Sequence, residues 1–195
     1  MRYGKEHKQA TRRRIIETAG RRFKRDGFDG SGMSTLMADA GLTTGAFYGH
    51  FASKGDLVAA VVADQLGKQG ESFHSRAPGR AGLEQLVREY LSVQQRDNRE
   101  DGCPSAALLD EIGRCTDTAK QAYTDGMLAS IENIAARLAP HDPPSARVKA
   151  LTVFAMMVGT LQLSRALTDP RLAADILEQG IDSALTLFGA DEHQS

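Results

Sequence analysis

Hydrophobic residues recur along this chain mainly at intervals of three and four, the spacing that places them on one face of an α-helix. The first such segment covers residues 8–26 and is otherwise rich in Arg and Lys. Its apolar stripe consists of Ile15, Ile16, Ala19 and Phe23. No segment alternates β-branched and polar residues between turn signals, as exposed strands do. The pattern therefore predicts an all-α protein.

Glycine, proline and capping residues divide the chain into about nine helices. Thr43 is suited to the N-cap of one helix, and Ser53 with Asp56 three residues later has the form of a capping box. Gly27 is a suitable C-terminal stop for the first helix, and Phe28 is expected to fold back onto the core. The expected helices cover about 8–26, 34–40, 43–51, 53–69, 81–97, 104–115, 118–138, 145–166 and 171–188.

The composition is that of a water-soluble globular protein. Of the 195 residues, 41% are hydrophobic and 25% are charged. The longest apolar run, residues 150–161, is too short to span a bilayer, and the N-terminus lacks the apolar segment of a secretory signal. We therefore expect a cytoplasmic protein without a membrane segment.

Charge is unevenly distributed between the first quarter of the chain and the rest. Residues 1–56 contain eleven Lys and Arg against six Asp and Glu, a formal charge of +5, whereas the remainder carries −6. A basic N-terminal part on an acidic body is typical of a nucleic-acid-binding head. Charge alone does not distinguish this arrangement from a solvated basic face.

The segment between residues 8 and 51 has the form of a helix-turn-helix. Two of its three short helices meet at Gly41, which permits a sharp turn. In such a unit the second helix of the pair enters the major groove of DNA. Leu42, Phe47 and Phe51 are spaced to pack inward against the first helix. The alternative is a glycine-loosened loop between two core helices.

This packing would leave the polar residues of "TTGAFYGH" facing outward. Gly45 and Ala46 would let the backbone approach the base edges, and Thr43 and Thr44 can bind phosphate at a helix N-terminus. The side chains expected to reach flanking phosphates are those of Tyr48, His50 and Lys54.

The sequence "TLMADAGLTTGAFYGHFASKGDL", residues 35–57, resembles the signature of TetR-family transcriptional regulators, and the resemblance covers about residues 10–60. It implies a homodimeric repressor that binds a palindromic DNA operator and is released by a small-molecule effector. The helix-turn-helix head would comprise residues 1–52, and the ligand-binding and dimerisation body residues 53–195. Met37, Gly49 and Gly55 depart from the more common residues of the family.

The resemblance also implies roles for individual residues of the head. Thr44, Gly45 and Ala46 would begin the base-reading helix. Ser34 and Thr35 would begin the bracing helix, which also touches DNA in the family. The remaining predicted DNA contacts are Thr43, Tyr48, His50 and Lys54.

The last two expected helices, 145–166 and 171–188, are the most apolar. Their stripes can either close the monomer core or pair with a second copy, and the resemblance implies a four-helix dimer interface.

The effector site is less clearly marked. Its candidate residues are Tyr90, Cys103, Leu108, Glu111, Tyr123, Met127, Phe154 and Met157, a set equally typical of a core. Cys103 precedes Pro104 at a helix start, where the helix dipole favours a thiolate. Some regulators resembling this one sense oxidants or electrophiles with a cysteine near this place; the alternative is an inert, half-buried residue.

Other function classes find less support in the sequence. No nucleophile with a nearby base, paired carboxylates, phosphate-binding loop or metal-ligand set is evident, so we expect neither an enzyme nor a bound cofactor or metal. The alternative function is a helical protein-interaction module without DNA binding. The +5 head and the residues from Thr43 to Lys54 favour DNA binding over it.

Overall fold

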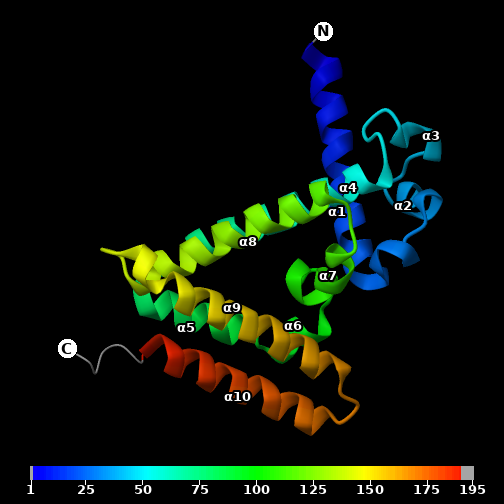
Figure 1. Ribbon diagram of the computed structural model, residues 1–195. Coiled ribbons are helices and arrows are strands. Elements are labelled where there is room, and N and C mark those ends of the chain that lie inside the picture. The colour runs from blue at the N-terminus through cyan, green and yellow to red at the C-terminus, as the bar shows by residue number, and fades with distance from the viewer. Residues whose placement is uncertain (1, 190–195) are drawn as a thin grey trace.

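The computed structural model describes residues 2–189. Residue 1 and residues 190–195, which the predicted domain ranges include, lie outside this part, as do the side chains of Arg2, Tyr3 and His74. Within it the protein is all-α, as expected, with ten helices instead of about nine and no strand (Figure 1). The helices are α1 Arg2–Gly30, α2 Met33–Asp39, α3 Thr44–Phe47, α4 Lys54–His74, α5 Gly79–Tyr90, α6 Val93–Asp97, α7 Pro104–Gly113, α8 Asp117–Leu138, α9 Pro143–Ala166 and α10 Pro170–Gly189.

The additional helix arises because the segment expected as one helix over 81–97 is broken. α5 ends at Tyr90, and α6 begins after Ser92, whose hydroxyl accepts a hydrogen bond from the Gln95 N–H at 3.1 Å. Serine in this role satisfies a backbone donor that the first turn of a helix leaves free. The prediction of a continuous helix was wrong because its apolar spacing continues across this cap.

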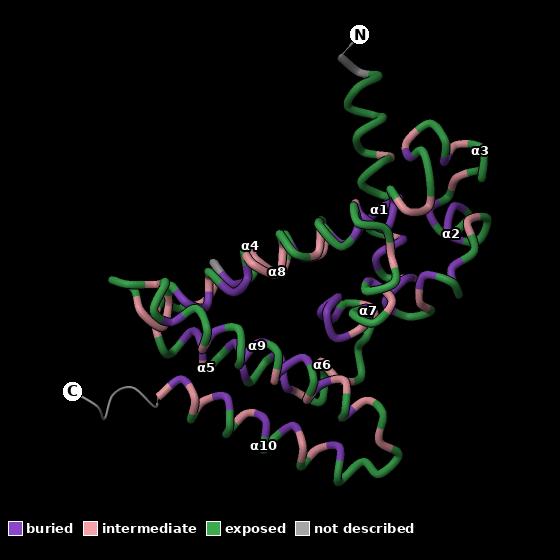
Figure 2. Tube along the Cα trace, viewed as in Figure 1, coloured by how far each residue is buried: buried purple, intermediate pink, exposed green. Residues whose placement is uncertain are grey.

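The corner of α1 confirms the predicted stop at Gly27. This residue has φ 77°, a value that favours glycine, and the helix is kinked there. Beyond the kink, Phe28 turns back so that its ring meets that of Phe23 edge to face, with centroids 5.1 Å apart. The helix also begins earlier than expected, at Arg2 instead of about residue 8, and residues 4–10 are exposed (Figure 2).

Two hydrophobic clusters form the interior. The first joins α1, α2, α3 and the first half of α4 to one face of α7, through residues such as Phe23, Phe47 and Leu108. The second joins α5, α8, α9 and α10 around residues such as Phe154 and Met157. Since α4 belongs to the first cluster and packs along α8, it links the head to the body (Figure 1).

α9 is long and apolar enough, by length and composition alone, to cross a membrane. Eight of its residues are buried in the protein, among them Val153, Phe154 and Leu161. A core helix satisfies the same criterion, and packing against α8 and α10 accounts for the buried part of its apolar surface.

The close packing of α4 on α8 generates a test of the fold. A Cβ at Gly126 of α8 would lie 2.5 Å from Cβ of Leu66, which is 1% exposed in α4. We expect Gly126→Ala to lower the free energy of unfolding by about 1–3 kcal/mol, because the helices must move apart. Urea denaturation measures this change.

Gly67→Ala is the matched control, because Gly67 also lies in a helix but has no atom within 4 Å of its added Cβ. It should be neutral or stabilising by about 0.5–1 kcal/mol. Equal destabilisation by both substitutions would contradict the packing described.

Candidate functional site

The turn between α2 and α3 is fixed by backbone bonds. Gly41 has φ 66°, as expected for a sharp turn, and the N–H of Leu42 donates to the Met37 carbonyl at 2.8 Å. Thr43 occupies the N-cap position of α3, but within the described head its hydroxyl makes no capping bond. The sequence analysis placed Thr43 correctly, and its side chain is left available to another partner.

Two aromatic residues anchor α3 to the rest of the head. Phe47 and Phe51 are buried, and their rings stack with centroids 5.6 Å apart. This confirms that they pack inward with Leu36 and Phe23. The opposite face of the segment is therefore held toward solvent by the hydrophobic packing beneath it.

The predicted DNA-contacting residues gather mainly on this exposed face. Thr43, Thr44 and Gly45 are exposed, Ala46 is half-buried, and the Tyr48 side chain is 72% exposed. The Tyr48 ring also contacts the edge of the Phe47 ring. Ser34 and Thr35, at the start of α2, are likewise exposed.

His50 is half-buried beside the basic first half of α1. Burial lowers the pKa of its imidazole, and the nearby cations of Lys8 and Arg12 lower it further. The neutral form is thus favoured near pH 7. Its Nδ1 is buried with no hydrogen-bond partner among the described residues. His50 can therefore offer a hydrogen bond to DNA, but not a strong positive charge.

Lys54 has a structural partner that the sequence analysis missed. Its ammonium donates to the Phe28 carbonyl oxygen at 2.5 Å and so braces the corner of α1. The two residues lie 26 positions apart, so no local pattern could indicate this pair. Its role in phosphate binding stays a prediction.

The first half of α1 adds a basic surface that the sequence analysis left unassigned. It projects beyond the head on the side of α3 and the start of α4 (Figure 1). The exposed cations of this segment, here called the basic arm, are Lys5, Lys8, Arg12, Arg13 and Arg14. The Arg12 guanidinium lies over the Phe51 ring, 4.7 Å from its centroid, which ties the arm to the α3–α4 junction.

Comparison with known proteins assigns this head to a family. The profile described as "Bacterial regulatory proteins, tetR family" matches residues 15–61, from the middle of α1 into α4. The head thus matches the N-terminal module of the tetR family of regulatory proteins. Among curated proteins, no sequence matches it.

Solved structures of other regulators share the TetR-like fold over nearly the whole chain. A TetR-family regulator from Cytophaga hutchinsonii superposes with a TM-score of 0.79 at 17% identity, covering 97% of this chain and 98% of that one. Reduced NemR of E. coli superposes with a TM-score of 0.75 at 18% identity, covering 90% of this chain and 95% of that one. FadR of Bacillus subtilis, in complex with stearoyl-CoA, superposes with a TM-score of 0.62 at 15% identity, covering 86% of this chain and 96% of that one.

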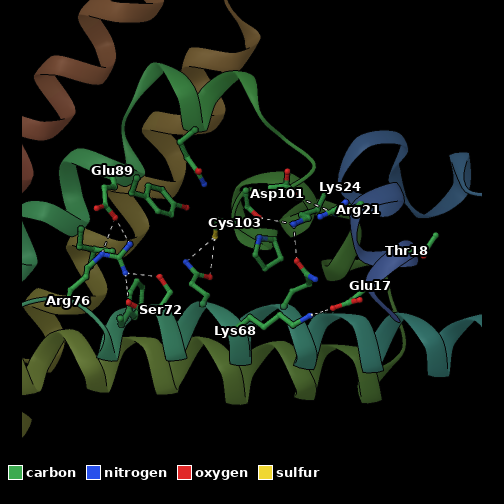
Figure 3. A pocket seen from close by; sticks show the side chains of 18 residues that line it. Glu17, Thr18, Arg21, Lys24, Lys68, Ser72, Arg76, Glu89, Asp101 and Cys103 are labelled. Carbon is green, nitrogen blue, oxygen red and sulfur yellow. Dashed lines mark hydrogen bonds and ion pairs between the residues drawn. The ribbon is translucent and has the colours of Figure 1, made fainter. Parts of the chain in front are cut away.

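The body contains a cavity of about 600 Å³ next to the head. α1, α4, α5 and the segment leading into α7 supply its walls, and Cys103 lies between two groups of charged side chains (Figure 3). Of the predicted effector-site residues, Tyr90 and Cys103 line it. The Cys103 sulfur is buried, 3.5 Å from the Gln69 amide nitrogen.

The other predicted effector-site residues lie elsewhere. Leu108 is part of the first cluster, whereas Phe154 and Met157 are part of the second, against which Met127 packs. The Tyr123 hydroxyl donates to Ser105 Oγ at 3.0 Å.

Glu111 accepts a hydrogen bond from the Phe28 N–H at 2.6 Å and therefore holds the corner of α1. The structure therefore places Glu111, like the five residues of the preceding paragraph, away from the cavity.

Lys24 is the cavity residue that sequence reasoning missed. It is 5% exposed, and its ammonium donates to Gln65 Oε1 at 2.8 Å and to the Gly102 carbonyl at 3.0 Å. Burial lowers the pKa of Lys24 to about 8, partly opposed by the nearby Asp101 carboxylate. On the sequence, Lys24 is one of many cations on α1, and nothing local distinguishes it.

The lowered pKa of Lys24 predicts a pH dependence of stability. Between about pH 8 and 10.5 the unfolded chain holds this proton more fully than the folded one, so the free energy of unfolding rises with pH. We expect wild type to gain up to about 3 kcal/mol over this range relative to Lys24→Met, in urea denaturation at several pH values. A constant difference between the two proteins would contradict the burial of this charge.

Proposed function

We propose that this protein is a TetR-family regulator, a ligand-responsive repressor that binds a palindromic operator as a homodimer and is released by a small-molecule effector. The observation that carries the proposal is the exposed α3 face beside the basic arm. A DNA-binding role also favours the cytoplasm as its location.

The roles of the head residues in this proposal follow from their exposure. Thr44, Gly45 and Ala46, at the start of α3, read base edges in the major groove. Tyr48 and His50 contact the groove wall and the phosphates, while Ser34, Thr35 and Thr43 donate from the starts of α2 and α3. Lys54 contributes mainly by bracing α1.

The exposed apolar stripe on α9 supports dimerisation. Val148, Leu151 and Leu163 are 76%, 47% and 53% exposed, and Ala155 and Gly159 lie between them at helical spacing. Leu172 on α10 is also exposed. Small residues between leucines allow two helices to approach closely, so α9 and α10 are suited to a four-helix interface. A dimer would present two α3 helices to successive turns of DNA.

The cavity supports an effector of small-molecule size. Its volume of about 600 Å³ is within the range of ligand sites. That FadR, which shares the fold, was crystallised with stearoyl-CoA is consistent with this role.

DNA binding is tested by separating phosphate contacts from base reading. We expect Lys8→Ala, in the basic arm beside His50, to weaken binding to all duplexes and to reduce the salt slope by about one unit. Thr44→Ala should leave the salt slope unchanged but alter the preference among operator variants. Fluorescence anisotropy on DNA upstream of the gene, at several salt concentrations, measures both.

Arg171→Ala is the control and should change neither quantity, because Arg171 is exposed on α10, a helix that lies apart from the head in Figure 1. The DNA proposal fails if wild type binds no duplex even at low salt.

The dimer is tested on α9. Leu151→Arg should convert the dimer to a monomer and lower operator affinity at least tenfold, because a charge would be buried at the centre of the interface. Light scattering after gel filtration gives the mass. Leu109→Arg, at an exposed leucine of α7, should stay dimeric. A wild-type protein that is monomeric at micromolar concentration would refute this arrangement.

A further inference from the structure

The charges around the cavity do not balance. Four cations and three carboxylates line it, so the wall carries an excess of one positive charge. Arg21 pairs with Asp101 at 3.2 Å, Lys68 pairs with Glu17 at 3.3 Å, and Arg76 pairs with Glu89. The excess charge is therefore that of Lys24, whose two hydrogen bonds go to the uncharged acceptors of Gln65 and Gly102.

Lys24 differs from its neighbours in burial as well as pairing. Arg21 is largely exposed, whereas Lys24 is 5% exposed and extends from α1 toward the cavity (Figure 3). A buried ammonium without a carboxylate partner gains strongly from an anion that enters the cavity, because charge-assisted hydrogen bonds are about twice as strong as neutral ones. This side chain makes the cavity selective for negative charge.

A second polar group in the cavity wall, the Tyr90 hydroxyl, lacks a strong hydrogen-bond partner. Tyr90 is 6% exposed, and its hydroxyl oxygen is buried with no hydrogen-bond partner among the described residues. Burial raises the pKa of this phenol well above its ordinary value, and the nearby Cys103 adds to the shift, but a thiol is a weak hydrogen-bonding group. A ligand oxygen that accepts from the phenol would remove an unsatisfied buried donor.

We propose that the effector is a small aromatic carboxylate bearing a second hydrogen-bonding oxygen, with its carboxylate on Lys24 and its second oxygen on Tyr90. This inference rests on the proposed function and names the chemistry of its effector.

The residue composition of the wall favours a compact ring over a long alkyl chain. Apolar surface comes mainly from Phe73, Leu86, Pro104 and the Tyr90 ring, whereas most of the other lining residues are charged or amide side chains. A flat ring can stack on the aromatic walls within this short apolar zone. A long chain would lie against the paired charges of Arg76 and Glu89, which it would desolvate without compensation.

The position of Lys24 on α1 connects the site to the head. Its ammonium fastens α1 to the Gly102 carbonyl, just before α7. A carboxylate competes for the same ammonium and so weakens this attachment. Binding of the anion therefore changes the position of α1, to which the basic arm and the packing of α3 belong.

The experiment uses the full-length wild-type protein and matched probes. Benzoate and 4-hydroxybenzoate are titrated calorimetrically, with benzamide, 4-hydroxybenzamide and benzylamine as the uncharged and cationic counterparts. We expect both acids to bind at least tenfold more tightly than their amides, the amine not to bind, and 4-hydroxybenzoate to lower operator affinity in anisotropy.

Variants assign the selectivity to the two residues. Lys24→Met should abolish the preference for acid over amide, whereas Lys68→Met should preserve it within threefold, because Lys68 is already paired with Glu17 and Asp64. Tyr90→Phe should weaken the binding of 4-hydroxybenzoate five- to tenfold and leave the affinity for benzoate unchanged. Circular dichroism confirms that each variant is folded, and the acid–amide comparison on wild type needs no variant.

The inference is overturned if amides bind as tightly as acids, if no probe binds the folded protein at millimolar concentration, or if Lys24→Met retains the preference. Operator binding without ligand is measured separately. If the protein binds its operator but gives any of these outcomes, only the proposed carboxylate site is refuted, and the proposed function stands. If the protein binds carboxylates but no DNA, the proposed function as a DNA-binding regulator is refuted and the proposed carboxylate site stands.

Discussion

The orientation of the head depends on how the corner of α1 is held at Phe28. Each backbone polar group of this residue, next to the kink at Gly27, has a side-chain partner from another helix. Glu111 of α7 accepts from its N–H, and Lys54 of α4 donates to its carbonyl. Buried backbone groups require such partners, so the corner cannot move without breaking these bonds or replacing them. Glycine is required at position 27, because its φ is 77° and a Cβ would lie 2.8 Å from Glu111 Oε1.

One short segment of the body connects this corner to the cavity and to α9, which carries the exposed apolar stripe. Gly102 and Cys103, at the cavity, lead directly into α7, which carries Glu111. On the other side, the Arg165 guanidinium of α9 donates to the carbonyls of Gln95, Arg96 and Ala106, and so fixes α6 and the start of α7. A displacement of residues 95–113 therefore reaches the head through Glu111 and α9 through Arg165. Such a contiguous set of bonds offers a physical basis for coupling between two sites.

The local features of this protein were predictable from its sequence, and the long-range ones were not. Apolar spacing and caps gave the helices, the inward packing of Phe47 and Phe51, and the capping bond from the Asp56 N–H to Ser53. The sequence did not reveal most of the cavity residues, because Met and aromatic side chains, which are typical of ligand sites, here mainly fill the two hydrophobic clusters. The walls of the cavity are mainly polar and include α1, a helix that the sequence analysis placed in the DNA-binding head. A charge pattern does not distinguish a buried lysine from its exposed neighbours.

Lys24 illustrates why a regulator can retain an unfavourable group. A buried ammonium without a carboxylate partner destabilises the folded protein, as its lowered pKa of about 8 indicates, and a methionine of similar length would avoid that penalty. The same ammonium is mostly charged at pH 7, so an anion can bind it without proton uptake. An anion bound there would offset this cost of burial and would compete with the Gly102 carbonyl for the ammonium. Because a ligand shifts an equilibrium only by its difference in affinity for two states, the proposed carboxylate would act on the head through this attachment of α1.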